Sequence, residues 1–340
     1  MLYIERKEFA LMDNSLSTPD IPTASDKAMR PRRLAHFQGQ PHLIDQLEIF
    51  ISAARLRGEL IDHCLLYGPP GLGKTTLAGI IAEEMGQQFL TSSGPLLQKP
   101  ADVVALLIQP TAPSVIFIDE IHRMPTHVEE LLYSAMEDQH VDILTDDRRS
   151  IRLTLEPFTL IGATTRQGSL SAPLRDRFGI HLRLNLYGLP ELAGVVYSAA
   201  QLLGLPLQDS QAMIIASRSR GTPRIALKNL RRIRDYFQAR GETDGVDDRT
   251  IAEALTFMGL NENGLNQSDR DYLNALINTF SGRPVGLNSL AAALGEDIGT
   301  LEDSIEPYLI QEGYVSRTSK GRVAMPKAYK AFPPQLNLVG

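Results

Sequence analysis

The chain has 340 residues, of which 43% are hydrophobic and 22% are charged. Because single cores seldom grow beyond about 250–300 residues, this length predicts two or three domains. The formal net charge of −6 argues against a protein coated in basic surface, although it allows local basic patches. The single cysteine, Cys64, excludes an intrachain disulfide and a cysteine-based metal site, and its apolar neighbours indicate a buried small residue.

The ends of the chain and its apolar runs bear on location. No apolar stretch approaches the roughly 20 residues that a membrane span needs. The first residues, MLYIERKEFALMDNS, mix acidic and basic side chains and lack an apolar core followed by a cleavage site, so we do not expect them to form a signal peptide. We therefore expect a cytoplasmic enzyme without a membrane partner. Residues 1–28, rich in Ser, Thr and Asp, are expected to form a mobile N-terminal tail.

Residues 29–186 have the pattern of an α/β domain. Short apolar runs bracketed by helices and turns are typical of strands buried on both faces of a parallel sheet. The predicted strands are Cys64–Tyr67, Val115–Ile118 and Phe158–Gly162, and the predicted helices are Pro41–Arg57, Lys74–Met85 and Val128–Asp138. Residues 141–155 alternate apolar and polar side chains around Asp146 and Asp147, which predicts a β-hairpin.

Two smaller domains are predicted after the α/β domain. Residues 187–260 form a helical domain whose expected helices are Pro190–Leu203, Ser210–Ser219, Pro223–Ala239 and Asp248–Met258. In residues 261–332 the expected helices are Gln267–Phe280, Leu287–Leu294 and Thr300–Gln311. Two short β-like runs follow these helices, and three helices with a two-stranded wing predict a winged helix, a common nucleic-acid-binding module. Residues 333–340 are expected to be a C-terminal tail.

A glycine-rich loop between a predicted strand and a predicted helix carries the first chemical signal. Residues 68–75, GPPGLGKT, fit the phosphate-binding pattern G-x-x-x-x-G-K-[ST]. Gly71 and Gly73 allow the backbone to wrap around an anion, and the following helix start adds partial positive charge. Lys74 is expected to reach the β- and γ-phosphates of ATP, and the Thr75 hydroxyl to ligate Mg²⁺.

Polar side chains at the ends of two predicted strands point to hydrolysis. Asp119 fits the role of holding Mg²⁺, and Glu120 that of orienting and deprotonating the attacking water. Thr165, after the third strand, is assigned to sensing the γ-phosphate. The alternatives are a solvated Asp-Glu pair and a Thr pair that caps a turn. His122 either joins a hydrogen-bond chain or has a surface or packing role.

Two arginines are candidates for contacts to the nucleotide from outside the loop. Arg177 is predicted to act as a finger on a neighbouring subunit's γ-phosphate, where such groups are worth roughly 10³–10⁵ in rate in GTPases. The alternative is a local salt-bridge cluster with Arg175 and Asp176. Arg224 opens a helix of the second domain and is expected to couple the nucleotide state to the domain angle. Its alternative is a surface arginine at a helix start.

The C-terminal region is locally basic within an acidic chain. From Gly313 to Gly340 there are five Lys or Arg and no Asp or Glu. Arg317 and Arg322 lie on the two predicted wing strands and are expected to contact DNA phosphates in a sequence-independent, salt-sensitive way. The alternative is a solvated charged wing without a ligand.

Together these blocks resemble the AAA+ ATPases and, more narrowly, the RuvB family of bacterial Holliday junction branch migration motors. The similarity runs from about Met29 to Tyr329. GPPGLGKTTLA and VIFIDE are generic P-loop features, whereas APLRDRFGI, RGTPRIA and EPYLIQEGY are much more specific to the family.

The resemblance implies a homohexameric ATPase ring on branched duplex DNA, with Mg²⁺ and ATP or ADP between subunits. It also implies a RuvA-like junction-binding partner and a RuvC-like resolvase during recombination and repair. Carried over by motif, the nucleotide-contacting residues are Met29, Arg30, Gly71, Lys74, Thr75, Thr76, Glu137, Asp138, Gln139, Arg177, Tyr187 and Arg224, and the DNA-contacting residues are Arg317 and Arg322.

The chain departs from the family pattern in three places. The hairpin at 141–155 is short and carries Asp146-Asp147 where glycines are customary, and the resemblance places the RuvA partner there. Ile298 occupies a position that is often basic, so one DNA contact is expected to be missing. The N-terminal tail differs from the family's usual start.

Two other functions remain open from the sequence. A clamp or helicase loader would use the same ATPase parts as a switch. A protein-remodelling chaperone would need an aromatic pore loop, and residues 92–99 offer no aromatic side chain.

Overall fold

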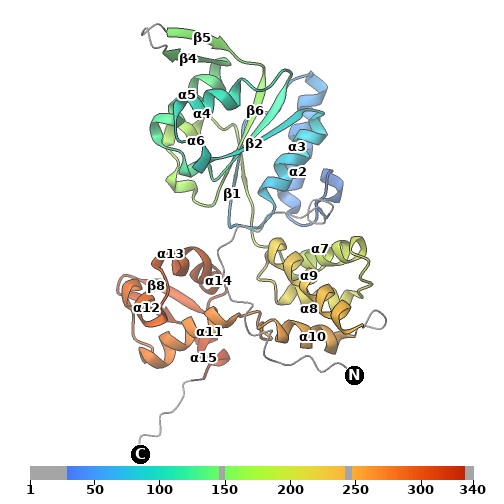
Figure 1. Cartoon of the computed structure of the whole chain (residues 1–340), viewed down its shortest axis with the longest axis vertical. Helices are drawn as coiled ribbons and strands as arrows, with labels where there is room; N and C mark the ends of the chain where they lie inside the picture. The colour runs from blue at the N-terminus through green and yellow to red at the C-terminus, as the bar shows by residue number, and fades with distance from the viewer. Residues whose placement is uncertain (1–28, 145–149, 242–246, 334–340) are drawn as a thin grey trace, which may run out of the picture. The chain divides into compact units, whose positions relative to one another are not determined.

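A computed structural model of the chain describes residues 29–144, 150–241 and 247–333 (Figure 1). The segment that ends at Arg30 and the body that begins at Pro31 are separate compact units, and the fold below is that of the body. The predicted tail at 1–28, the hairpin tip with Asp146 and Asp147, and residues 334–340 lie outside the described residues. No helix in the described ranges is long and apolar enough to cross a membrane.

A five-stranded parallel sheet forms the centre of the α/β region, with the strand order β2-β3-β6-β1-β7. The strands are β1 (Cys64–Tyr67), β2 (Gln88–Ser93), β3 (Ser114–Asp119), β6 (Phe158–Thr164) and β7 (Ile180–Arg183). The three predicted strands are confirmed. The two edge strands were not predicted, because β2 is partly exposed along its length and β7 buries only alternate residues.

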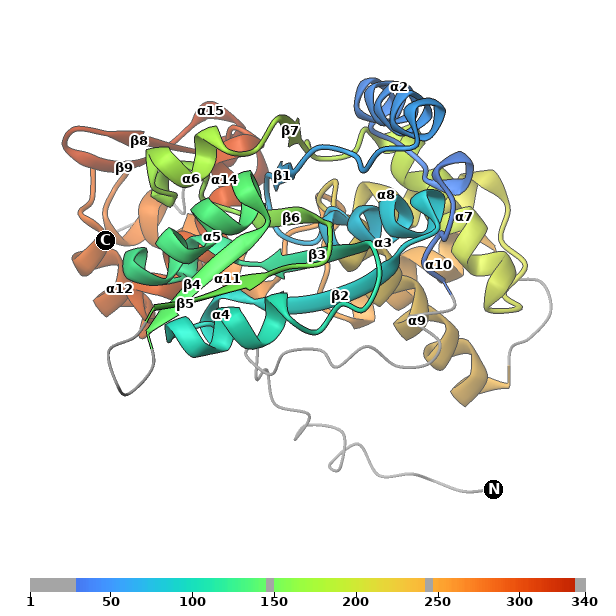
Figure 2. The same cartoon turned by 90° about the horizontal axis from the view of Figure 1, so that it is seen from above.

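Helices cover both faces of this sheet (Figures 1 and 2). They are α2 (Pro41–Arg57), α3 (Lys74–Met85), α4 (Pro100–Leu107), α5 (Thr126–Asp138) and α6 (Ala172–Asp176). The three predicted helices are confirmed, two of them with the predicted bounds. Proline at the first position fits the start of α2, and Gly58 ends it in the left-handed conformation that glycine adopts without strain.

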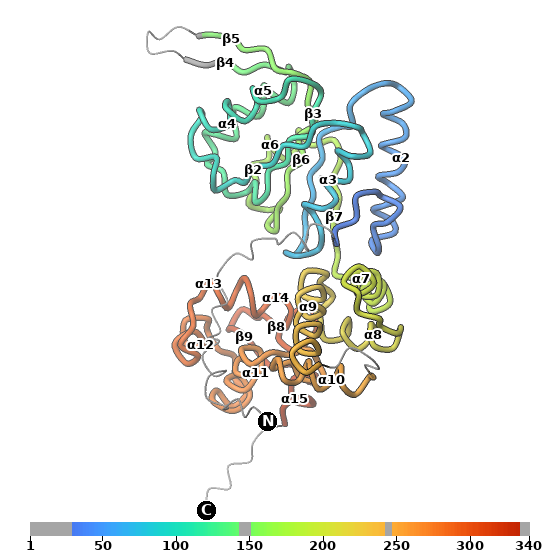
Figure 3. Tube along the Cα trace, turned by 45° about the vertical axis from the view of Figure 1, so that its right-hand side comes forward, coloured from blue at the N-terminus to red at the C-terminus, as the bar shows by residue number. Residues whose placement is uncertain are grey.

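The predicted hairpin is confirmed as β4 (His140–Leu144) and β5 (Ser150–Thr154), a separate antiparallel pair (Figure 3). Asp142 and Arg152 face each other across it, with two hydrogen bonds of 2.9 and 3.0 Å between carboxylate and guanidinium. Both side chains are exposed, so this pair contributes little to stability.

Four helices follow the sheet: α7 (Leu189–Leu202), α8 (Asp209–Ser217), α9 (Pro223–Arg240) and α10 (Asp248–Phe257). All four were predicted. Each buries an apolar stripe at helical spacing, as with Leu192 and Val196 in α7.

The C-terminal region is a winged helix. Its elements are α11 (Gln267–Asn274), η6 (Ala275–Thr279), α12 (Leu287–Leu294), α13 (Ile298–Thr300), η7 (Leu301–Ile305), α14 (Glu306–Gln311), β8 (Val315–Thr318), β9 (Gly321–Ala324) and α15 (Pro326–Ala331). The three predicted helices and the wing are confirmed, but η6 and η7 are π-helical turns within two of those helices, and α15 was not predicted. Its core includes Tyr272, Leu276 and Leu309, all fully buried.

Candidate functional site

The loop between β1 and α3 has a backbone that only glycine adopts easily at three positions. Gly68, Gly71 and Gly73 have φ values of 144°, 80° and 99°. A Cβ atom on Gly71 would lie 2.8 Å from the Cγ2 atom of Thr222, so glycine is also required by space. Since α3 begins directly after Gly73, the N–H groups of its first turn are free to bind an anion.

Lys74 lies inside this loop with only 7% of its surface exposed. Its Nζ atom donates to the carbonyl oxygens of Gly68 and Pro69 at 2.9 and 2.8 Å. Burial lowers the pKa of Lys74 to about 8, the Asp119 carboxylate opposes the shift, and the Arg224 guanidinium adds to it. A buried cation bonded to neutral carbonyls is well suited to donate hydrogen bonds to a phosphate oxygen.

The two predicted acids lie at the carboxyl end of β3. The Glu120 N–H donates to Asp119 Oδ1 at 2.9 Å. Glu120 has φ 47°, a left-handed conformation that costs a non-glycine residue about 1–3 kcal/mol and that clusters at functional sites. Its carboxylate accepts from Arg123 Nη1 at 3.0 Å, and both side chains are about half exposed. Such a surface pair is weak enough to exchange for another partner.

A hydrogen-bonded pair lies at the end of the neighbouring strand β6. Thr164 is buried, and its Oγ1 atom lies 3.0 Å from Nδ1 of His122. Thr165, the residue assigned to sensing the γ-phosphate, follows β6 and is exposed. Of the two alternatives for His122, the structure has the hydrogen-bond chain. Burial lowers the pKa of His122, which favours the neutral ring in this bond.

Arg177 follows α6 and contacts α5 rather than the loop. Its guanidinium pairs with the Glu137 carboxylate at 3.1 Å, donates to the Pro173 carbonyl at 2.9 Å and lies over the Tyr133 ring at 4.5 Å. Arg175 and Asp176 form their own long contact of 3.9 Å, so Arg177 is not part of a local cluster with them.

The predicted nucleotide contacts therefore fall into two groups. Glu137, Asp138 and Gln139 end α5 as exposed residues beside Arg177. Within the described ranges, no hydrogen bond or ion pair joins Arg177 or Glu137 to the loop of residues 68–75.

Tyr187 and Arg224 belong with the loop. The Tyr187 hydroxyl donates to the Leu72 carbonyl at 3.4 Å, and burial raises the pKa of this hydroxyl and keeps it a donor. The Arg224 N–H donates to the Gly71 carbonyl at 3.2 Å, and Arg224 as a whole is exposed. The start of α9 thus contacts the phosphate-binding loop directly.

The remaining residues predicted to contact the nucleotide differ in their burial. Thr75 and Thr76 are half-buried in the first turn of α3. Met29 is buried and Arg30 exposed in the separate segment that ends at Arg30.

The acids and hydroxyls at this site bear on metal binding. Within the described part of the chain, no three His, Cys, Asp or Glu side chains lie together as a metal site. A hydroxyl from Thr75 and a carboxylate from Asp119 nevertheless fit Mg²⁺, which binds through few protein ligands and takes the others from phosphates and water.

The two wing arginines share a buried acid. Arg317 donates from Nε and Nη2 to Glu306 Oε2 at 2.8 and 2.5 Å, and Arg322 donates from Nε to Oε1 at 2.9 Å. The Tyr272 hydroxyl also donates to Oε1 at 2.8 Å. Glu306 is fully buried, whereas the side chains of Arg317 and Arg322 are 47% and 15% exposed. Arg322 also pairs with Glu302 at 3.1 Å.

Glu306 was missed by sequence reasoning. It opens α14, 11 residues before Arg317 and 16 before Arg322. An acid at the start of a largely apolar helix was the one signal, and it does not identify the partners. Ile298 occupies the position that is often basic in the family, and it is 42% exposed.

Comparisons with known proteins agree along the chain. Residues 29–184 match the P-loop domain of the Holliday junction DNA helicase RuvB, residues 187–261 the RuvB AAA lid domain, and residues 262–333 the RuvB C-terminal winged helix domain. A structure of RuvB from Thermotoga maritima, described as a Holliday junction branch migration motor, is 44% identical with a TM-score of 0.81. That match covers 91% of this chain and 99% of the other.

A mutant of the same Thermotoga protein is also 44% identical, with a TM-score of 0.82 over 90% of this chain and 99% of that one. The predicted fold is therefore confirmed as a parallel α/β P-loop core with an AAA lid and a C-terminal winged helix. A P-loop domain of this kind makes the protein an ATP-hydrolysing enzyme. The chain belongs to the RuvB family of Holliday junction branch migration ATPases.

Proposed function

We propose that this chain is the motor subunit of a homohexameric ring that moves duplex DNA at Holliday junctions, powered by ATP, in recombination and DNA repair in the cytoplasm. The observation that carries the proposal is the division of the nucleotide residues into two groups. Lys74, Tyr187 and Arg224 lie at the loop, whereas Arg177 pairs with Glu137 elsewhere. A heterologous, ring-forming interface would bring one chain's first group to the next chain's second.

The reaction at the loop is hydrolysis of ATP to ADP and phosphate. Lys74 and the N–H groups at the start of α3 bind the β- and γ-phosphates. Thr75 and Asp119 would hold Mg²⁺, which neutralises developing phosphate charge when bound. Glu120 leaves Arg123, orients a water molecule and takes its proton as the water attacks the γ-phosphorus. Thr165 contacts the γ-phosphate.

A neighbouring chain completes the site. Its Arg177 stabilises charge on the transferring phosphoryl group, which in related nucleotide hydrolases is worth roughly 10³–10⁵ in rate. Within its own chain, Arg177 is held against α5 by the Glu137 carboxylate and by the face of the Tyr133 ring. Glu137, Asp138 and Gln139 then lie against the neighbour's nucleotide, and Met29 and Arg30 contact the chain's own.

The wing and the hairpin would contact the partners. Arg317 and Arg322 are the proposed DNA-binding residues, and the greater exposure of Arg317 favours it for a direct phosphate contact. The hairpin of β4 and β5 would dock a RuvA-like junction-binding protein, and a RuvC-like resolvase would act on the same junction.

The test is branch migration of a synthetic four-way junction, measured together with ATP hydrolysis. We expect the junction to move only with Mg²⁺ and hydrolysable ATP, and branched DNA to stimulate hydrolysis. A RuvA-like protein should increase both rates. Stimulation by a loaded clamp or by a protein substrate, without junction movement, would instead indicate a loader or a protein-remodelling enzyme.

A further inference from the structure

The loop between α8 and α9, residues 218–222, is held in one conformation by buried polar contacts. Ser219 is fully buried, and its hydroxyl accepts from Asn229 Nδ2 at 3.1 Å. The Thr222 N–H donates to the Ser219 carbonyl at 3.0 Å, which closes the turn. Arg220 has φ 55°, a region that side chains other than glycine adopt only when the surroundings enforce it. The loop therefore behaves as a rigid piece.

One side of this loop contacts the phosphate-binding loop. Thr222 and Arg224 leave no room for a Cβ atom on Gly71, and the Arg224 N–H donates to the Gly71 carbonyl. The Gly221 carbonyl accepts from the Tyr187 N–H at 2.9 Å. When the phosphate-binding loop shifts on binding or hydrolysis of nucleotide, these contacts transmit the shift directly to the loop of residues 218–222.

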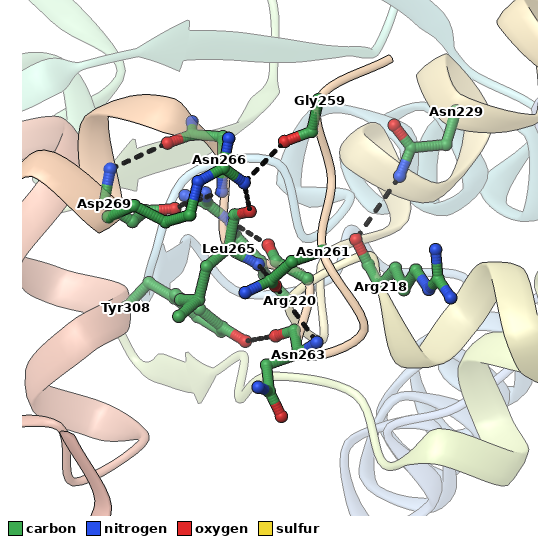
Figure 4. A network of polar contacts seen from close by, with 12 residues as sticks. Arg218, Arg220, Asn229, Gly259, Asn261, Asn263, Leu265, Asn266, Asp269 and Tyr308 are labelled. Carbon is green, nitrogen blue, oxygen red and sulfur yellow. Dashed lines mark hydrogen bonds and ion pairs between the residues drawn. The ribbon is translucent and has the colours of Figure 1, made fainter. Parts of the chain in front are cut away.

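The other side contacts the winged helix, chiefly through the side chain of Arg220 (Figure 4). Its Nη2 atom pairs with the Asp269 carboxylate, and its Nε atom donates to the Gly264 carbonyl at 3.3 Å. Its guanidinium lies over the Tyr308 ring, 4.8 Å from the centroid. A Cβ atom on Gly264 would lie 3.0 Å from the Cα atom of Arg218, so the two backbones approach closely.

The carboxylate of Asp269 requires a partner at this contact. It is fully buried, and its Oδ2 atom also accepts from the Asn266 N–H at 2.9 Å in the first turn of α11. Burial raises the pKa of Asp269, and the Arg220 charge opposes this rise. A planar guanidinium can bond the carboxylate, bond a carbonyl and stack on a ring at once, which an ammonium group cannot do.

We propose that Arg220 is a positioning residue that fixes the winged helix to the loop of residues 218–222, which leads directly into Arg224 at the start of α9. Only three residues lie between Arg220, whose side chain reaches α11, and Arg224, whose N–H bonds the phosphate-binding loop. Movement at Gly71 therefore carries the first helix of the winged helix with it. The inference rests on the proposed motor function, because it assigns the means by which nucleotide changes reach the DNA-contacting wing.

The test measures how closely the motions of the helical domain (residues 187–260) and the winged helix are coupled. Spin labels are placed on exposed helix positions by Gln201→Cys in α7 and Ala292→Cys in α12. The native Cys64 does not compete, because it is buried and burial raises its pKa. Distances between the labels are then recorded with ADP and with a non-hydrolysable ATP analogue.

We expect a narrow distance distribution in the parent, and one about twofold broader in Arg220→Gln, because the tether is lost. Arg249→Gln is the matched control, since Arg249 is a lid arginine whose side chain is 85% exposed and pairs within its own helix. It should leave the width unchanged. An unchanged width in Arg220→Gln would overturn the proposal; if that variant does not fold, an unchanged width in Arg220→Lys would do so.

A functional measurement separates positioning from stability. Junction movement per ATP hydrolysed should fall about tenfold in Arg220→Gln, while hydrolysis without DNA stays within about twofold of the parent. Equal losses of both would indicate a merely structural role and contradict the proposal. If the parent moves no junction, the motor function fails, and the label distances still decide the role of Arg220.

Discussion

The phosphate-binding loop and the wing both place positive charge where a phosphate is expected, but they hold it differently. Lys74 is buried, and its hydrogen bonds go to neutral carbonyls, so burial depresses its pKa. Arg317 and Arg322 instead share the buried carboxylate of Glu306. An anion at the loop meets a buried cation that Asp119 compensates only in part, whereas an anion at the wing meets charges that are already paired. A bound phosphate should therefore stabilise the charged side chain of the phosphate-binding loop far more than it stabilises those of the wing.

The largest effect is expected at the loop. Lys74→Ala should lower ATP hydrolysis on the order of 10³-fold or more, because it removes a cation from the transferring phosphoryl group. The fold should persist, since the Lys74 side chain bonds only its own loop. Steady-state ATPase assays and circular dichroism measure the two outcomes. Lys228→Ala, an exposed lysine of α9, is the control, and parental turnover in Lys74→Ala would reject the assignment.

The next effect concerns stability of the winged helix. Glu306→Ala leaves Arg322 largely buried without its main partner, so the unfolding free energy of this region should fall by about 3 kcal/mol or more. Hydrogen exchange in α11 and α14 measures this locally. Glu312→Ala is the matched control, because the side chains of Glu312 and Lys327 are 39% and 46% exposed and such pairs are worth about 0–1 kcal/mol. Equal losses of protection in both variants would contradict the comparison.

A smaller effect should distinguish the two wing arginines. Arg317→Gln should weaken duplex DNA binding and reduce the slope of log K against log salt by about 0.9, as for one lost phosphate contact. Arg322→Gln should reduce this slope less, because the Arg322 side chain is only 15% exposed and its guanidinium is bonded to Glu302 as well as Glu306. Binding titrations at several salt concentrations decide between them. A reduced slope in Arg322→Gln alone would reverse the assignment.

The smallest effect is a proton taken up at the loop. In the protein without nucleotide Lys74 has a pKa of about 8, and a bound polyphosphate raises it. ATP binding should therefore take up about half a proton at pH 8, more at pH 9 and almost none at pH 6. Calorimetry in buffers of different ionisation enthalpy measures the uptake. Lys74→Arg, which stays protonated throughout, should show none; uptake equal to the parent's would place the proton on another group.

Most of the fold could be predicted from local sequence patterns. The bounds of α2, β1 and α3 agree with those predicted, because proline and glycine punctuation and apolar runs mark them within a few residues. The edge strands β2 and β7 were not predicted, because partial exposure weakens their apolar signal. The phosphate-binding loop is equally local, so its glycines and Lys74 could be identified without a structure.

The rest of the site depends on contacts between distant segments. Glu137 lies in α5 and Arg177 just after α6, and Glu306 in α14 pairs with Arg317 and Arg322 on the two wing strands. No periodicity specifies such partners, since any of several acids could satisfy the same arginine. The roles assigned to these residues, and to Thr165 and Arg224, remain predictions.

The claim that a neighbouring chain completes each nucleotide site is tested most directly by mixing two variants. Lys74→Ala and Arg177→Ala should each be nearly inactive alone. In an equal mixture, about a quarter of the interfaces of a ring would combine an intact loop from one chain with an intact Arg177 from the next. We expect the mixture to recover ATP hydrolysis approaching that fraction of the wild-type rate. A mixture as inactive as its two components, or an Arg177→Ala protein as active as the wild type, would contradict it.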